Sequence, residues 1–278
     1  MISADIHIIS ALLVRNLFVV LVLGTWLVFI KKENILEELK EKYDFYLPAS
    51  FFSVVCNTGG YAMSLMYLSA PEAIIVHYTY PLFTVFASLY VTHERPGAVD
   101  YIAGLLIICG AYIGAIGPVE TSGTSFLGII WGFVSVCGMT LLVLFTRRKA
   151  KKYPVNQYML LFFSNLIGGS FLFACKTFFA GWQDIFNFTP LYFVVTIFQA
   201  AVSTLAAYAF FYSAFNYIPA ALVSIITSFE IIMVLSLSFL ITRVAPTTYE
   251  IAGSLLIILA IACAAVMGGL GGKTKNGT

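Results

Sequence analysis

The chain has 278 residues, of which 60% are hydrophobic and only 10% are charged. Soluble globular domains average roughly 45–50% apolar and about 25% charged residues, so the composition excludes an ordinary soluble domain. The net charge of +2 gives no indication of nucleic-acid binding. Because the charges are gathered in short clusters between long apolar runs, the sequence predicts an all-α polytopic membrane protein.

Nine apolar segments are long enough to cross a bilayer, whose hydrocarbon core of about 30 Å takes roughly 20 helical residues. In chain order they are 7–30, 50–69, 72–92, 99–119, 124–146, 157–179, 190–213, 220–242 and 249–269. Very short connections separate the second from the third and the seventh from the eighth. We therefore expect tight antiparallel hairpins at these two places.

The distribution of basic residues predicts the orientation, because Lys and Arg are enriched in cytoplasmic loops. If nine spans alternate, twelve basic residues fall on one side, whereas only Lys176 and Arg243 lie towards the other. The twelve are Lys31, Lys32, Lys40, Lys42, Arg95, Arg147, Arg148, Lys149, Lys151, Lys152, Lys273 and Lys275. The C-terminus is thus expected in the cytoplasm and Met1 outside, in the plasma (inner) membrane, without a signal peptide.

The longest connector, residues 31–46, carries Ile35, Leu36, Leu39 and Tyr43 at helical spacing. Two interpretations stay open for it: a helix on the cytoplasmic membrane surface, or a solvated helical linker of mixed charge.

Five cysteines lie inside apolar runs and form no CxxC pair, so they are interpreted as buried hydrophobes rather than metal ligands or disulfides. They are Cys56, Cys109, Cys137, Cys175 and Cys263. The sequence has no nucleotide-binding loop, metal cluster or nucleophile constellation. An enzyme is not expected, nor is a metal or any other cofactor.

The sequence also repeats itself at a spacing near 149 residues. IAGLLII at 102–108 returns as IAGSLLI at 251–257, and Tyr61-Ala62 returns as Tyr208-Ala209 at a spacing of 147. Spans one to four therefore correspond to spans six to nine. Since five crossings separate the members of each pair, the two halves, 1–119 and 120–278, are predicted to run in opposite directions through the membrane. Inverted repeats of this kind are typical of transporters, although a duplication retained only for stability is the alternative.

Span five has no repeat partner, because a segment 149 residues earlier would precede Met1. The pattern predicts a 5+5 inverted repeat whose first helix is absent. A misplaced start codon, a genuine nine-span variant and a truncated product are the alternatives.

Several motifs resemble the EamA-like, ten-helix members of the drug/metabolite transporter superfamily. LLVRNLF around Arg15 is similar to the family's second helix, and YTYPLFTVFASLYVTHE (78–94) to its Pro-(x)12-Glu fourth helix, through Pro81 and Glu94. YAFFYSAFNYIPAALVSIITSFE (208–230) is similar to the eighth and ninth helices. Two departures stand out. Glu230 precedes Ile231 where the family has Pro, which predicts a less kinked helix, and Arg243 stands where a second helix-terminal Glu is expected.

Polar residues within the spans are candidates for the transport site, because burying a charge near the bilayer centre costs at least about 2.5 kcal/mol. Glu230, about 15 Å into its span, is predicted to bind a substrate amine, to carry a proton, or to pair with Arg15. Arg15 and Glu94 are expected to be structural charges. His77 is expected near the outer mouth, where it is a cavity candidate that senses pH or meets substrate, or is bonded to a neighbouring loop. A second group is predicted to line a largely apolar cavity, with interhelical hydrogen bonding as the alternative role for each member: Asn57, Tyr61, Tyr78, Trp131, Gln199, Ser203 and Tyr208.

The resemblance implies a secondary transporter that exports a small metabolite, such as an amino acid or a similar amphipathic solute, by alternating access. Its expected partners are that solute, the lipid bilayer and, as one alternative, a coupling proton; the oligomeric state is left open. A sugar-phosphate or nucleotide-sugar antiporter is a second hypothesis, but such cargo needs several deep basic residues and only Arg15 qualifies. A non-transporting membrane scaffold or accessory subunit is the third.

Overall fold

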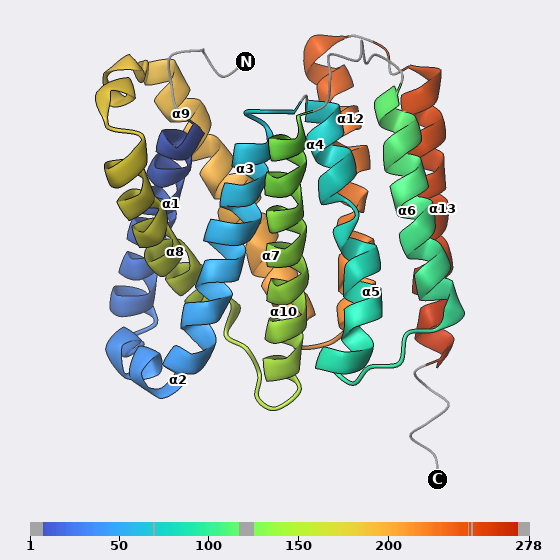
Figure 1. The fold of residues 1–278 in the computed structure, drawn as a ribbon. Coiled ribbons are helices and arrows are strands. Elements are labelled where there is room, and N and C mark those ends of the chain that lie inside the picture. The colour runs from blue at the N-terminus through green and yellow to red at the C-terminus, as the bar shows by residue number, and fades with distance from the viewer. Residues whose placement is uncertain (1–7, 69, 117–124, 244, 246, 272–278) are drawn as a thin grey trace.

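The computed structural model describes residues 8–68, 70–116, 125–243, 245 and 247–271 (Figure 1). Throughout these ranges the regular structure is helical, and the helices lie side by side as one bundle. This confirms the predicted all-α polytopic membrane fold. Five helical stretches are long and apolar enough to cross a membrane on their own: Ile8–Ile30, Glu72–Val91, Phe126–Ala150, Gln157–Phe179 and Pro190–Ala214.

The elements of the first half follow the expected spans. Span one is α1 (Ile8–Thr25) with η1 (Trp26–Ile30), and span two is the end of α2 (Ile35–Ser50) with η2 (Phe51–Gly59) and α3 (Gly60–Ser64). Span three is α4 (Ala70–His77) with α5 (Tyr80–Val91), and span four is α6 (Ala98–Ile116).

The second half begins with span five, α7 (Phe126–Ala150), and span six, α8 (Gln157–Phe179). After a short 3₁₀ turn, η3 (Gln183–Asn187), span seven consists of α9 (Pro190–Gln199), η4 (Ala200–Ala206) and α10 (Ala207–Ala214). Span eight is α11 (Ala220–Thr227) with α12 (Phe229–Thr242), and span nine is α13 (Thr248–Gly271).

The irregularities of the backbone repeat with the sequence. The π-helical segments η2 and η4 start at Phe51 and Ala200, 149 residues apart. Spans three and eight are both interrupted, after His77 and after Thr227. A residue with positive φ follows the end of each helix beyond the break: His93 (53°) two residues after α5, and Arg243 (59°) directly after α12. By its positive φ Arg243 resembles His93, whereas the 149-residue spacing pairs it with Glu94, as the sequence indicated.

The repeated phrases of the sequence pack against each other. α6 and α13, which carry them, lie side by side (Figure 1), and a Cβ added to Gly110 would meet the carbonyl oxygen of Gly253 at 2.7 Å. Small residues let two backbones approach this closely in a membrane protein. The other repeat pair, α1 and α8, is also in contact.

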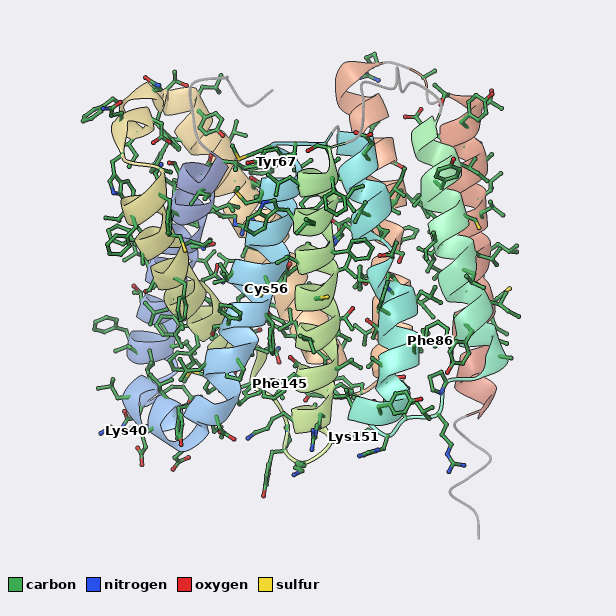
Figure 2. The ribbon with its side chains drawn as sticks, in the orientation of Figure 1. Lys40, Cys56, Tyr67, Phe86, Phe145 and Lys151 are labelled. Atoms are coloured by element: carbon green, nitrogen blue, oxygen red, sulfur yellow. The ribbon has the colours of Figure 1, made fainter. Side chains whose placement is uncertain are left out.

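Most basic side chains lie at one end of the bundle, which we call the basic end. Figure 2 shows Lys40 and Lys151 there, Lys40 at the left edge and Lys151 nearer the middle of the pictured bundle. The connector before span two forms α2, capped by Asn34, whose side chain accepts a hydrogen bond from the Glu37 amide. Ile35 and Leu39 pack against the buried core while Leu36 is 71% exposed, so α2 is a partly packed extension of span two at this end.

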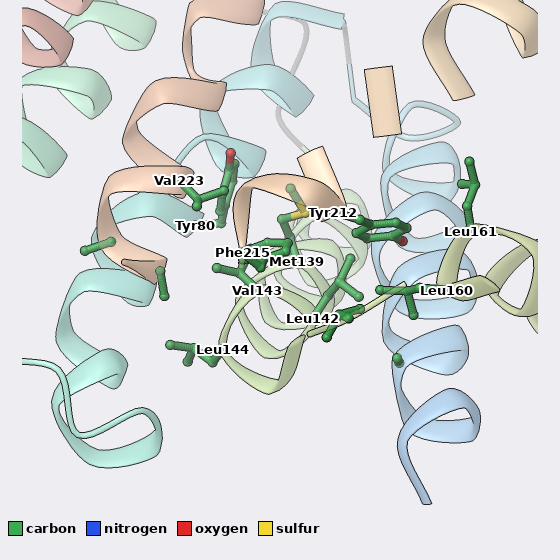
Figure 3. Packing of buried hydrophobic residues seen from close by; sticks show 14 of the residues in the cluster. Tyr80, Met139, Leu142, Val143, Leu144, Leu160, Leu161, Tyr212, Phe215 and Val223 are labelled. Carbon is green, nitrogen blue, oxygen red and sulfur yellow. The ribbon is translucent and has the colours of Figure 1, made fainter. Parts of the chain in front are cut away.

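The core lies where span five crosses the other spans. Figure 3 shows Met139, Leu142 and Val143 of α7 among Tyr212, Phe215 and other buried residues. Helices pack closely around this core. The two neighbouring glycines of α8, Gly168 and Gly169, differ in how much space they leave for a side chain.

We expect Gly168→Ala to lower stability much more than Gly169→Ala. A Cβ on Gly168 would overlap the Cβ of Val54 and stand 2.9 Å from the carbonyl oxygen of Ser50, whereas for a Cβ on Gly169 the nearest atom is 3.4 Å away. Overpacking of this kind costs about 1–3 kcal/mol. Thermal unfolding of the two variants in detergent measures the difference, and equal melting temperatures would contradict the tight contact.

A buried ion pair secures the opposite end. The Lys176 side chain is fully buried and its Nζ lies 2.8 Å from Oδ1 of Asp184, which also accepts a hydrogen bond from Ser10. The ammonium also lies 5.3 Å from the ring centroid of Trp182. The pair joins span six to the η3 turn and to span one.

Lys176→Met is expected to destabilise the protein by about 3 kcal/mol, because it leaves Asp184 largely buried without its cation. Lys42→Met is the control: Lys42 pairs with Glu38 within α2, with its side chain 39% exposed, and such pairs contribute below about 1 kcal/mol. The comparison is made by thermal unfolding. A Lys42 variant as unstable as the Lys176 variant would argue against a special role for the buried pair.

Candidate functional site

The site is built where two interrupted helices meet. Between α4 and α5 the helix breaks at Tyr78 and Thr79, just before Pro81. Proline has no N–H, so it cannot bond to the carbonyl of His77 four residues earlier. Breaks of this kind inside a membrane are tolerated where they line a cavity or are bonded by neighbouring groups.

Span eight breaks at Ser228 although no proline is present. The missing proline predicted a less kinked helix; the break is shorter than in span three, but it persists. The hydroxyls of Ser224, Thr227 and Ser228 all donate to backbone carbonyls one turn back, and such bonds compete with the helical ladder.

Hydrogen bonds join the two breaks directly. The Tyr80 hydroxyl donates to the carbonyl of Ser224 at 3.3 Å and shares a hydrogen bond with the Thr227 hydroxyl. The Tyr78 hydroxyl donates to Oε2 of Glu230 at 3.2 Å. Side chains from the first half thus bond both the backbone and the carboxylate of the second.

His77 lies among three tyrosine rings and not at the mouth. Its ring centroid is 5.0 Å from Tyr61, 5.4 Å from Tyr78 and 5.3 Å from Tyr80. Its Nδ1 is 2.9 Å from the hydroxyl of Ser135 on α7. The expectation of a bond to a neighbouring loop is therefore wrong: the break in span three places His77 against span five.

Polar contacts continue from His77 towards span seven. The Ser135 hydroxyl donates to the backbone carbonyl of Asn57 at 2.9 Å, and its distance to Oδ1 of Asn57 is 3.3 Å. Tyr208 interacts with the Asn57 side chain and lies near Arg15. Within the described residues no ion pair joins Arg15 to Glu230, so that expected pairing is not formed; Nε of Arg15 is buried without a hydrogen-bond partner.

We call this connected set the central polar cluster. Its members are Asn57, Tyr61, His77, Tyr78, Tyr80, Ser135, Tyr208, Thr227 and Glu230. Tyr78 and Tyr80 are buried, whereas part of the Glu230 residue is exposed, so Glu230 lies at the edge of the cluster. The arrangement suits an organic solute with a positive group: a carboxylate pairs with an ammonium, and aromatic rings attract cations through their faces.

Three predicted site residues lie elsewhere. Gln199 and Ser203 are exposed on span seven. Trp131 is partly buried on α7, where its backbone carbonyl would be 3.1 Å from a Cβ on Gly60. Conversely, Tyr80, Ser135 and Thr227 were not predicted. The YTYP run signals Tyr80, because two tyrosines directly precede a helix-breaking proline.

A second constellation closes the basic end, and we call it the latch. Glu94 accepts a hydrogen bond at 2.8 Å from Nε of Arg147 on α7 and one at 3.0 Å from the backbone N–H of Ala220. Arg147 also donates to the carbonyl of Phe215 at 2.7 Å. Lys151 lies 3.4 Å from Glu94 and donates to the carbonyl of Thr92. The latch joins separate parts of the chain: span three, span five and the hairpin between spans seven and eight all contribute contacts.

Glu94 thus joins the end of span three to span five and to the start of span eight, and its role as a structural charge stays a prediction. Its side chain is 12% exposed and that of Arg147 is 14% exposed. A second contact supports the same hairpin, since the Asn216 amide exchanges two hydrogen bonds with the backbone of Val155.

Comparisons with known proteins agree with this architecture. A solved crystal structure resembles the fold with a TM-score of 0.77 and 14% sequence identity, covering 94% of this chain and 88% of that chain. At that identity the likeness establishes the fold alone. No curated protein matches the chain. The model of the EamA-like transporter family matches residues 1–115 and 126–266. The chain is therefore a multi-pass membrane protein of the EamA-like transporter family, within the drug/metabolite transporter superfamily.

Proposed function

We propose that the protein exports a small amphipathic solute with an amine, such as an amino acid, by alternating access. The observation that carries this proposal is the meeting of two interrupted, oppositely directed helices at Glu230. Broken helices at the interface of inverted repeats are where secondary transporters hold their substrates. The family supports the direction of transport.

The solute's amine binds the Glu230 carboxylate, and its apolar body rests against the rings of Tyr61 and His77. Tyr78, which donates to Glu230, fixes the carboxylate's position. As an alternative role, Glu230 couples solute transport to a proton: its carboxyl group would bind the proton and the solute in turn.

The basic end faces the cytoplasm in this proposal, in accordance with the excess of Lys and Arg there. With the latch closed, the route from the central polar cluster to that end is blocked. When the latch opens and the opposite end closes, the central polar cluster becomes accessible from the cytoplasm. In an exporter this is the state that binds the solute.

A screen of ligands on the purified protein tests the proposal. Amino acids, nucleosides, small organic cations and sugar phosphates are compared for their effect on thermal unfolding, since a ligand that binds only the folded state raises its stability. Hits are then tested for flux in proteoliposomes. We expect amine-bearing solutes to stabilise the protein and to cross the membrane.

Other outcomes distinguish the alternatives. Stabilisation by sugar phosphates alone would favour the antiporter hypothesis, although the described part of the cluster presents an acid, Glu230, with the guanidinium of Arg15 near Tyr208. Stabilisation without flux would favour a scaffold or accessory subunit.

A further inference from the structure

Arg15 is a cation within a membrane span for which the described residues provide no counter-charge. It lies about 10 Å along α1 from Ile8. Its Nε is buried without a hydrogen-bond partner, and no ion pair among the described residues includes its guanidinium. Two other largely buried cations differ in this respect, because each has an acid beside it: Arg147 pairs with Glu94, and Lys176 pairs with Asp184. A cation that served only to hold helices together would have such a partner.

The surroundings of Arg15 place it beside the central polar cluster. α1 is in contact with α3, which carries Tyr61, and with η4, which leads into α10 and Tyr208. Arg15 interacts electrostatically with Tyr208, and Tyr208 interacts in the same way with Glu230. The Tyr208 hydroxyl therefore lies near a cation and near an anion that form no ion pair with each other in the described ranges. Charges at membrane depth face a bundle interior or a water-filled cavity, and they mark substrate pathways.

The repeat indicates that the scaffold needs neither charge at its position. At the 149-residue spacing Arg15 corresponds to Ser164, and Glu230 corresponds to Pro81. Ser164 is buried on α8, which packs against α1, so the equivalent place in the second half folds around a neutral side chain. Each half thus contributes one charge that its counterpart lacks. A site built in this way has a positive end and a negative end.

We infer that Arg15 binds a carboxylate of the transported solute, so that the solute is a zwitterion whose amine binds Glu230. The N–H donors of a guanidinium form a planar fork that matches both oxygens of a carboxylate. The hydroxyl of Tyr208 lies alongside the bound solute, near both of its charged ends. The inference rests on the proposed function, because it assigns a second charged group to the same solute.

The balance of charge favours a carboxylate over a phosphate at this place. One guanidinium and one acid together neutralise a zwitterion. A phosphate monoester carries a charge of about −2, so Arg15 alone would leave part of that charge unbalanced near Glu230. A simple amine would leave Arg15 without an anion, as in the empty site.

Matched sets of solutes separate the two charges. Each set holds an amino acid, the amine that remains without its carboxylate, and the acid that remains without its amine. Leucine, isoamylamine and isocaproate form one set; phenylalanine, phenethylamine and hydrocinnamate form another. Binding to the purified chain is measured by calorimetric titration. The amino acid should bind at least about tenfold more tightly than its amine, as expected for hydrogen bonds between charged groups.

Variants assign that preference to one side chain. Arg15→Gln should bring the ratio of the two affinities close to one, while the affinity for the amine stays unchanged. Arg15→Lys keeps the charge but loses the planar fork, so it should restore part of the preference. Arg148→Gln is the control, because Arg148 is exposed at the basic end, and it should leave the ratio as it is.

Chemical modification of the original protein covers the case in which the Arg15 variants do not fold. Phenylglyoxal reacts with guanidinium groups, and mass spectrometry of peptides locates the modified arginines. Leucine, phenylalanine and the two acids should slow modification of Arg15, whereas the two amines should not. The rate at exposed Arg148 is the reference, since it corrects for reagent consumed by the solutes.

The outcomes separate this inference from the proposed function. Amino acids that bind no more tightly than their amines, and that leave Arg15 equally reactive, would overturn the inference while an amine-binding transporter stands. Binding of the acids with protection of Arg15, without binding of any amine, would remove the amine from the proposed function but support the carboxylate site. Protection of Arg15 by glucose phosphate and by no carboxylate would overturn the inference, and a lack of any binding or protection would overturn both.

Discussion

Replacing Glu94 with glutamine is expected to open the basic end of the bundle. Glu94 is the one acceptor that Arg147, Lys151 and the Ala220 amide share in the described latch. Its loss leaves the largely buried guanidinium of Arg147 with the Phe215 carbonyl but without a counter-charge. Removing one partner of such a pair costs about 3–5 kcal/mol. Part of that cost is avoided if the hairpin of spans seven and eight moves away and Arg147 becomes hydrated.

Thiol accessibility measures the opening. Thr84→Cys in a cysteine-free background places a thiol on α5, between the central polar cluster and the latch, at a fully buried position. A membrane-impermeant maleimide added on the basic side should react at least about tenfold faster in the Glu94→Gln protein, since 1.4 kcal/mol corresponds to tenfold. Glutamine retains one acceptor oxygen. The expected rise in reaction rate is therefore smaller than the rise that complete loss of the Glu94–Arg147 pair would give.

Glu38→Gln is the matched control. Glu38 lies at the same end and also has two partners, Lys42 and Tyr46, but both belong to α2. Its loss separates no span from another, so the reaction rate at Thr84→Cys should not change. If Glu94→Gln reacts no faster than this control, the latch does not control access from the basic end.

The fold was predictable because its main signals are local. An apolar run of about 20 residues is recognisable without knowing its neighbours, and the 149-residue spacing relates segments without any knowledge of their contacts. The repeated IAG phrase even marks the two helices that pack together through Gly110 and Gly253. The interruption at Ser228 was not expected. It depends on side-chain hydroxyls that donate to backbone carbonyls of the same helix, and the folded surroundings determine whether these hydrogen bonds form.

The site was predictable only in part, for a geometric reason. Gln199, Ser203 and Tyr208 were all predicted to line the cavity, and at 3.6 residues per turn Gln199, Ser203 and, less closely, Tyr208 share one helix face. The π-helical turns of η4 lie between them and alter that count, so Tyr208 contacts Asn57 while Gln199 and Ser203 remain exposed. π-helical turns are frequent at functional sites, and a sequence read at the α-helical period cannot place the residues beyond one.

Ser135 and Thr227 show a second limit. Each is a small residue with a hydroxyl group. Such residues in a transmembrane helix can also donate to a carbonyl of their own helix, without any contact to another span. Their importance lies in their partners, His77 for Ser135 and Tyr80 for Thr227, which come from a different span. These contacts depend on how neighbouring helices are aligned along and around their axes. The hydrophobic pattern of the sequence does not specify that alignment.

Glu230→Gln is expected to weaken binding of an amine-bearing solute by roughly 10- to 100-fold, because a hydrogen bond to a charged group contributes about 1.5–3 kcal/mol. The substitution preserves size and an oxygen that can still accept from Tyr78. A neutral analogue of the same solute, lacking the amine, should bind the variant and the original protein equally. Calorimetric titration of both solutes against both proteins measures the change.

Two further comparisons decide what Glu230 does. Glu250→Gln, which removes the carboxylate that caps Thr247 at the start of α13, should leave affinity unchanged. If Glu230 also carries the coupling proton, flux through the Glu230→Gln protein loses its dependence on external pH, because glutamine has no proton to exchange. A variant that keeps full affinity for the amine and an unchanged pH profile would remove Glu230 from the transport site, and the carboxylate would then serve only to hold Tyr78 across the meeting point of the two broken helices.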